Sequence, residues 1–420
     1  MNRAGLRPAT IIALAVAASA CASATQAGSS STDVQSFAIL EQGRLMATAG
    51  DCIACHTATP DRPFAGGRSI ATPFGTLVAP NITPDRETGI GGWSDDEFVD
   101  AVQKGIRNDG AHLYPAMPYP YYANMNRDDV LAIRAFLDTQ TPTRNPVQAN
   151  HLPFPFSMRV SMAGWDMLFF SDKGPLHPAG PTPEWNRGAY LVNGPGHCGA
   201  CHTEKNFLGA DRESLTLQGG LVQGWFAPAL TRDQRLGLGS WSVDDVVAYL
   251  KTGHNKVSAA TGPMAEVVAD STSMLPDADL RAIAVYLKDQ PATIDGAEQP
   301  LPATDAAMKD GEHIYGAVCS ACHGANGTGI AGLFPSLKGN PELQSKDATT
   351  PIRVVLEGTH SVATDTAPTA GAMPAMGWKL SDRQIADVIT YVRNAWGNAA
   401  PAVHDDAVAA MRKTAAASSD

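Results

Sequence analysis

The pentapeptide Cys-x-x-Cys-His occurs three times, as Cys52-Ile53-Ala54-Cys55-His56, Cys198-Gly199-Ala200-Cys201-His202 and Cys319-Ser320-Ala321-Cys322-His323. Two thiols at this spacing lie on one helical turn, where each can form a thioether with a vinyl group of haem, and the histidine that follows can ligate the iron. A thioredoxin-like site needs no such histidine, and a zinc site would need further paired ligands. The three motifs therefore predict three covalently bound c-type haems.

A methionine beside a proline follows each motif and is the candidate for the sixth iron ligand: Met117, Met264 and Met373. Methionine opposite histidine suits an electron-transfer haem, and the neighbouring proline leaves the loop little conformational freedom to lose. Each motif also has a second candidate, since methionine often only fills a core; these are Met125, Met274 and Met376. A histidine could replace methionine on iron; the candidates are His112, His254 and His360.

The surroundings of the motifs also repeat. A short helix with a glycine is predicted before each motif, and the glycines are Gly43, Gly188 and Gly311. An amphipathic helix with an aromatic residue is predicted at the end of each repeat, and the aromatics are Phe136, Tyr286 and Tyr391. Because glycine in a helix costs about 1 kcal/mol relative to alanine, its recurrence predicts a close crossing with the aromatic of the last helix.

Helix starts are marked by serine followed three residues later by an acidic or amide residue, at Ser94, Ser242 and Ser381. The repeats divide the chain into a first unit at 37–142, a second at 182–291 and a third at 304–398, with a linker at 143–181 and a flexible tail at 399–420. A unit of about 100 residues is small for an independent core, and a covalent haem would supply much of its apolar bulk.

Composition agrees with a folded chain of several domains. The chain has 420 residues, which at about 150 residues per domain corresponds to two to four domains. It is 44% hydrophobic and 17% charged, which argues against coiled coils and disorder. The formal net charge of −11 opposes binding to nucleic acid, so no DNA or RNA partner is expected.

Residues 1–27 are predicted to be a secretory signal peptide. Arg3 and Arg7 precede an apolar stretch at 9–20 that is too short to span a bilayer. Cleavage before Cys21 would also allow this cysteine to be lipidated. Export would place the chain in an oxidising compartment, where cysteines normally form disulfides or hold a cofactor.

The linker contains an apolar insert at 152–170. On a helix, Met158, Met162, Trp165 and Phe169 would share one face. The segment carries both Arg159 and Asp166 and is too short for a transmembrane helix. Contact with a membrane interface, contact with a partner subunit and packing between the units are the three interpretations that remain.

Longer stretches resemble one protein family: Gly50-Asp51-Cys52, Asn81-Ile82-Thr83-Pro84-Asp85, Leu113-Tyr114-Pro115-Ala116-Met117-Pro118-Tyr119-Pro120, Gly194-Pro195-Gly196-His197-Cys198 and Gln384-Ile385-Ala386-Asp387-Val388. The chain resembles the tri-haem cytochrome c subunits of bacterial membrane-bound dehydrogenases, which serve alcohol, gluconate, sorbitol, fructose and aldehyde dehydrogenase complexes. The resemblance implies an all-α fold of three tandem class I cytochrome c domains with loop-rich connections.

The resemblance also implies a function. Each haem would have histidine and methionine as axial ligands, and electrons would pass from a separate catalytic subunit through the haems to ubiquinone. The chain would be attached peripherally to the periplasmic face of the cytoplasmic membrane and would hold no catalytic residues. Two alternatives stay open: a free-standing multihaem electron shuttle, and a haem peroxidase or reductase with one open haem.

Overall fold

A computed structural model describes residue 1, residues 31–292 and residues 298–418. The predicted signal peptide lies outside the described residues except for Met1. The chain divides into two compact units, residues 1–38 and 39–420, and the sites discussed below all lie in the second. The described part is mainly helical, with three small antiparallel hairpins. Among these described residues, no helix is both long and apolar enough to cross a membrane.

The elements around the first motif and the insert are α1 (Ser31–Ala49), α2 (Cys52–His56), β1 (Ser69–Thr72), β2 (Gly75–Val78), α3 (Asp95–Lys104), α4 (Tyr119–Tyr122), α5 (Arg127–Asp138) and α6 (Val160–Phe169). Those around the second are α7 (Pro183–Asn193), α8 (Gly199–His202), η1 (Glu213–Leu215), β3 (Gly220–Val222), β4 (Trp225–Ala227), α9 (Val243–Thr252), α10 (Pro263–Asp270), η2 (Thr272–Met274) and α11 (Asp277–Asp289).

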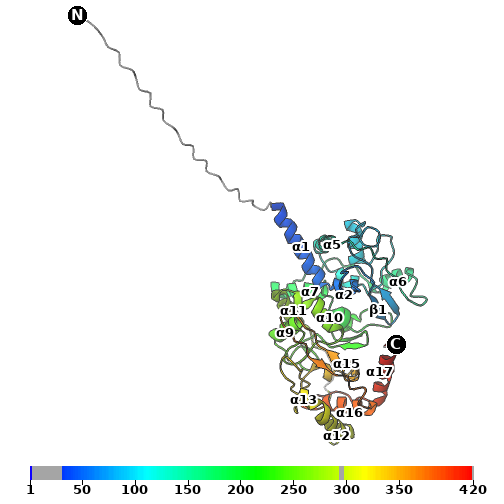
Figure 1. Cartoon of the computed structure of the whole chain (residues 1–420), viewed down its shortest axis with the longest axis vertical. Coiled ribbons are helices and arrows are strands. Elements are labelled where there is room, and N and C mark those ends of the chain that lie inside the picture. Colours follow the sequence, from blue (N-terminus) through cyan, green and yellow to red (C-terminus); the bar gives the residue numbers. More distant parts are fainter. Residues whose placement is uncertain (2–30, 293–297, 419–420) are drawn as a thin grey trace. The chain divides into compact units, whose positions relative to one another are not determined.

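The elements around the third motif are α12 (Ala306–Ile314), the π-helical turn η3 (Tyr315–Cys319), α13 (Ser320–His323), α14 (Pro341–Gln344), α15 (Thr349–Glu357), β5 (Thr359–His360), β6 (Ala372–Met373), α16 (Asp382–Val392) and α17 (Asp405–Ser418). Figure 1 shows α12, α13, α16 and α17, in yellow to red, gathered at one end of unit 39–420.

The predicted helix crossing is present in all three repeats. A Cβ atom added to Gly43 would lie 3.0 Å from the Cβ of Phe136 on α5. The same atom on Gly188 would lie 2.8 Å from the Cβ of Tyr286, and on Gly311 it would lie 2.6 Å from the Cβ of Tyr391. The missing side chain therefore lets the first and last helices of each repeat approach closely, which confirms the prediction.

The predicted helix starts are confirmed as well. Ser94, Ser242 and Ser381 each accept a hydrogen bond from the backbone three residues on, and the side chain at that later position bonds back to the serine N–H. This reciprocal pair satisfies two backbone donors that the first helical turn would otherwise leave unpaired. Helices α3 and α9 both end at a glycine in the left-handed region, Gly105 at φ 66° and Gly253 at φ 76°.

In the part of the chain that the structure describes, buried hydrophobic residues form two clusters. The first includes Met46 and Ile133 from around the first motif together with Leu191 and Ile283 from around the second. The second lies around the third motif and includes Ile385. The first two repeats thus share a continuous core.

The expectation of a flexible tail from 399 to 420 is wrong for residues 405–418. They form α17, whose Val408 is fully buried in the cluster around the third motif. The guanidinium of Arg412 donates hydrogen bonds to Asp382 and to the carbonyl oxygen of Leu380. The alanine-rich composition of the tail gave no indication that Val408 would be buried or that Arg412 would form these hydrogen bonds.

Candidate haem-attachment sites

Short helices carry the cysteines and histidine of each motif. Helix α2 holds all of the first, while Cys198 and Cys319 are the residues just before α8 and α13. The six cysteines of the described residues form no disulfide with one another. Burial raises the pKa of the Cys52 and Cys198 thiols to about 12.

Each motif histidine is oriented by a prolyl carbonyl. The Nδ1 atom lies 2.7 Å from the carbonyl oxygen of Pro80 for His56, 2.7 Å from that of Pro228 for His202, and 3.1 Å from that of Pro335 for His323. Burial lowers the pKa of all three histidines. With the Nδ1 proton donated to a carbonyl, a neutral imidazole presents a lone pair at Nε2, which is the form that ligates a metal.

The third motif lines a cavity that is partly open to solvent. Cys319, Cys322, His323 and Met373 all line it. The other walls are largely apolar and come from the loop after the motif and from α14, α15 and α16; they include Phe334, Leu343, Val354, Val388 and Ile389. Two thiols, an imidazole, a thioether sulfur and apolar walls fit a covalently bound haem in this cavity.

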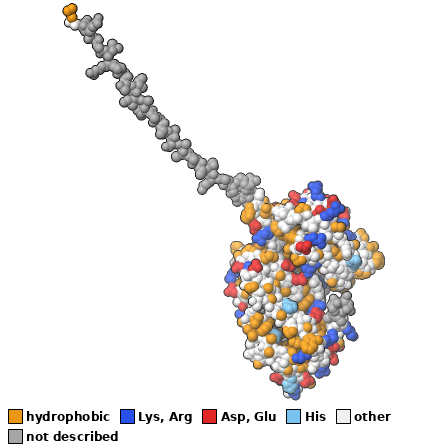
Figure 2. Space-filling model, viewed as in Figure 1, with side chains coloured by type: hydrophobic (Ala, Val, Ile, Leu, Met, Phe, Trp, Pro, Cys, Tyr) orange, Lys and Arg blue, Asp and Glu red, His pale blue; other side chains and the backbone are white. Residues whose placement is uncertain are grey.

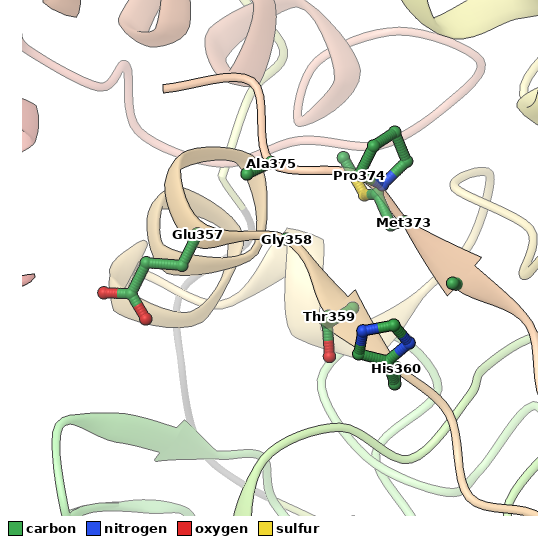
Figure 3. Close-up of a pocket in the computed structure, with 8 residues that line it drawn as sticks. Glu357, Gly358, Thr359, His360, Met373, Pro374 and Ala375 are labelled. Atoms are coloured by element: carbon green, nitrogen blue, oxygen red, sulfur yellow. The ribbon is translucent and has the colours of Figure 1, made fainter. Parts of the chain in front are cut away.

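Met373 also borders a second hollow. Figure 3 shows Met373 and Pro374 on one side of it and the end of α15 with β5 on the other. The carboxylate of Glu357 points away from Met373 in this view, and its partner is the guanidinium of Arg353 at 3.1 Å. His360 lies on β5 opposite Ala372.

Met117 and Met264 occupy equivalent positions in the first two repeats. The N–H of Leu113 donates to the carbonyl of Gly105 at 2.7 Å, and that of Ala260 donates to Gly253 at 2.6 Å. Met117 lies four residues after Leu113, and Met264 lies four residues after Ala260. Both methionines are partly buried against the shared core, as are Cys52 and Cys198.

The second candidate methionines have other surroundings. Met125 is 1% exposed within the shared core, where its backbone carbonyl accepts a hydrogen bond from Gln103. Met274 is 50% exposed. Met376 packs against the core around the third motif. Met373 lines the same cavity as Cys319, Cys322 and His323, and the role of Met117, Met264 and Met373 as ligands stays a prediction.

An acidic cluster that the sequence did not reveal lies between the first two motifs. Asp51 precedes Cys52, and the Oδ1 atom of Asp51 is buried without a hydrogen-bond partner in the described part of the chain. Burial and the nearby carboxylates of Asp270 and Glu266 raise the pKa of Asp51 to about 8, against the opposing effect of Arg68. No local pattern could predict this cluster, because Arg68 and Glu266 are 198 residues apart.

One stretch, Ser258 to Asp270, contributes to all three sites, and we call it the bridging segment. Its beginning, at Ser258, Ala259 and Thr261, lines the cavity of the third motif. Its middle carries Met264. Its helix α10 contacts α2, where the guanidinium of Arg68 donates to Glu266 at 2.6 Å and to the Ala54 carbonyl at 2.5 Å.

Comparison with known proteins places this arrangement in a family. The family model for cytochrome c matches residues 308–396. The cytochrome c subunit of the quinone alcohol dehydrogenase of Gluconobacter oxydans is 42% identical over 87% of this chain and 80% of its own length. The gluconate 2-dehydrogenase cytochrome c subunit of Pantoea cypripedii is 39% identical over 91% of both chains.

The chain belongs to the dehydrogenase cytochrome c subunits. A further member, the fructose dehydrogenase cytochrome subunit of Gluconobacter japonicus, is 37% identical over 89% of this chain and 82% of its own. As a dehydrogenase cytochrome c subunit, the chain is an electron-transfer protein with covalent haem c and is not the catalytic subunit of its complex. The family and the noncatalytic role predicted from the sequence are thereby confirmed.

Proposed function

We propose that this subunit carries three haem c groups and passes electrons from a dehydrogenase catalytic subunit to ubiquinone. The observation that supports three groups is the recurrence of one arrangement: two thiols and a histidine on a short helix, with the histidine Nδ1 held by a prolyl carbonyl. The shared cytochrome c family supports the electron-transfer role.

The attachment residues in this proposal are the six motif cysteines: Cys52, Cys55, Cys198, Cys201, Cys319 and Cys322. The axial pairs are His56 with Met117, His202 with Met264, and His323 with Met373. When bound, each haem supplies an iron that is reduced and oxidised by one electron. The protein fixes the histidine tautomer through the prolyl carbonyl, presents a thioether on the opposite side and surrounds the group with apolar side chains.

We assign one cytochrome c domain to each motif, at 37–142, 182–291 and 304–398. The subunit would act at the periplasmic face of the cytoplasmic membrane. The surface proposed for membrane contact is the insert, where Phe154 is 78%, Val160 73%, Met167 82% and Leu168 67% exposed. Apolar side chains of this size enter the boundary between lipid headgroups and acyl chains favourably.

The spectrum and mass of the exported protein test this proposal. Intact mass should include three haems, and the oxidised protein should show a near-infrared sulfur-to-iron charge-transfer band from three haems. Met117→Ala, Met264→Ala and Met373→Ala should each remove about one third of that band, since one of three equivalent ligands is lost. A native high-spin haem that turns over peroxide would contradict the proposal, as would a mass with fewer than three haems.

A further inference from the structure

The loop that carries Met117 is tied to the insert at both of its ends. At the beginning of the loop, Nδ1 of His112 lies 2.7 Å from Oδ2 of Asp166 on α6. At its end, the hydroxyl of Tyr119 donates a 2.5 Å hydrogen bond to Oδ1 of the same carboxylate. One aspartate on α6 therefore holds the two residues that flank the Leu113–Pro118 stretch.

Further contacts join the same two segments. The guanidinium of Arg159 donates to the carbonyl of His112 at 2.9 Å, and it lies 5.0 Å from the ring centroid of Tyr114. The hydroxyl of Tyr114 donates to the carbonyl of Phe156 at 2.9 Å. The ring of Tyr119 meets that of Phe170 edge to face at 5.2 Å. The insert thus contacts the loop on both sides of Met117 in the sequence.

The hydrogen bonds to the Asp166 carboxylate are partly shielded from solvent. The side chain of Asp166 is 14% exposed and that of His112 is 27% exposed, so solvent competes little with the hydrogen bonds. Hydrogen bonds to an ionised group are roughly twice as strong as those between neutral groups. Loss of the carboxylate would leave two donors without their acceptor.

We propose that the insert is a clamp for the Met117 loop and that Asp166 is a positioning residue, which holds Met117 at the iron of the first haem. This inference rests on the proposed ligand role of Met117. The clamp lowers the conformational freedom that the loop would lose when the sulfur binds iron. The insert would therefore have a structural role, holding the Met117 loop, in addition to any role of its exposed apolar side chains.

The second repeat provides an internal comparison. Ala259 occupies the position that corresponds to His112, because it pairs with His254 as His112 pairs with Ile106. An alanine side chain has no polar atom to bind. Met264 is held instead at the start of α10, directly after Pro263. Removal of the Asp166 carboxylate should therefore affect the first haem and leave the second and third unchanged.

The test uses the exported three-haem protein with Asp166→Ala, Asp166→Asn and Tyr119→Phe. The charge-transfer band is followed while pH is raised until methionine is displaced from iron. Asp166→Ala should lower the pH at which about one third of the band disappears by about one unit or more, because the released loop competes less well with other ligands. The potential of the same haem should fall, since methionine ligation raises it.

The other variants make the result specific. Asp166→Asn keeps one acceptor oxygen and should give a smaller shift. Tyr119→Phe keeps the ring and removes one donor, and its effect should not add to that of Asp166→Ala if both act through the same hydrogen bond. Asp61→Asn removes an equal charge from the exposed surface of the first repeat and should leave the band unchanged.

The outcomes separate this inference from the proposed function. If Met117→Ala leaves the band intact, the ligand assignment fails. If Met117→Ala removes one third of the band while Asp166→Ala matches the parent protein at every pH, the clamp is overturned and the ligand assignment stands. Equal loss of all three parts of the band in Asp166→Ala would indicate general destabilisation and would also overturn the clamp.

Discussion

Glu342 is the carboxyl group in the wall of the third cavity. Burial raises its pKa from 4.5 to about 7, although a hydrogen bond with Thr350 acts in the opposite direction. The unfolded chain therefore releases this proton at a lower pH than the folded chain. The stability contributed by the protonated group is complete below pH 4.5, declines as pH rises from 4.5 to about 7, and is absent above.

Glu342→Gln should accordingly raise the free energy of unfolding at pH 8, by no more than about 3 kcal/mol, and the gain should shrink towards pH 5. Guanidinium titrations of the haem-containing protein at both pH values measure this difference. Glu312→Gln, on the exposed side of α12, is the matched control and should show no such trend. Identical pH dependence of the two variants would contradict the prediction.

Residues that act through local spacing could be predicted, and residues that act through distant contacts could not. The cysteines and histidine of each motif lie on one helical turn, so their pattern is visible in the sequence. His112 and Asp166 are 54 residues apart, and no periodicity connects them. The sequence allows His112 to be an ordinary loop residue or an alternative iron ligand, and the structure pairs it with Asp166.

Helix crossings allow a prediction at the scale of elements. A Cβ atom at Gly311 would lie 2.2 Å from the carbonyl oxygen of Asp387 on α16, so Gly311→Ala must push α12 and α16 apart. We expect a loss of about 1–3 kcal/mol in the free energy of unfolding, measured by denaturant titration. Gly316 has no atom within 4 Å of an added Cβ, and Gly316→Ala should cause no such loss and should raise the free energy of unfolding by up to about 1 kcal/mol, because alanine is favoured over glycine in a helical turn.

The helices with clear local signals were predictable for the same reason. A glycine, an aromatic residue and a serine cap each act within a few residues or at one helix contact. The helix α17 had no such signal, because the side chains by which it packs against the core, Val408 and Met411, stand singly among alanines. Its order depends on Arg412 and on surfaces contributed by α15 and α16, which the tail sequence does not contain.

At the scale of the whole molecule, the insert presents an apolar surface. Figure 2 shows hydrophobic side chains gathered over the region of α6. A double variant Met167→Gln and Leu168→Gln should lower co-flotation with phospholipid vesicles by about tenfold or more, because two large apolar side chains would no longer enter the lipid.

Leu221→Gln serves as the control for this double variant, since Leu221 is 56% exposed on β3. It should float with vesicles as the parent protein does. Equal flotation of all three proteins would show that lipid contact occurs elsewhere.

The division into three repeats was visible in the sequence, but the joining of the first two was not. The first two motifs have the same Cys-x-x-Cys-His spacing as the third, so the motifs do not show which repeats pack together. No local pattern indicates that the side chain of Met125, in the first repeat, would lie 3.6 Å from a Cβ added to Gly194, in the second. Shared cores depend on side chains that meet only after folding.

The bridging segment from Ser258 to Asp270 restricts how this chain can change in evolution. Deletion of one residue there would displace Met264, rearrange a wall of the third cavity and misalign Glu266 with Arg68. Surface loops commonly tolerate insertions and deletions, but this one should keep a fixed length wherever the three centres are retained. Its length is therefore a feature to follow among descendants of the same gene.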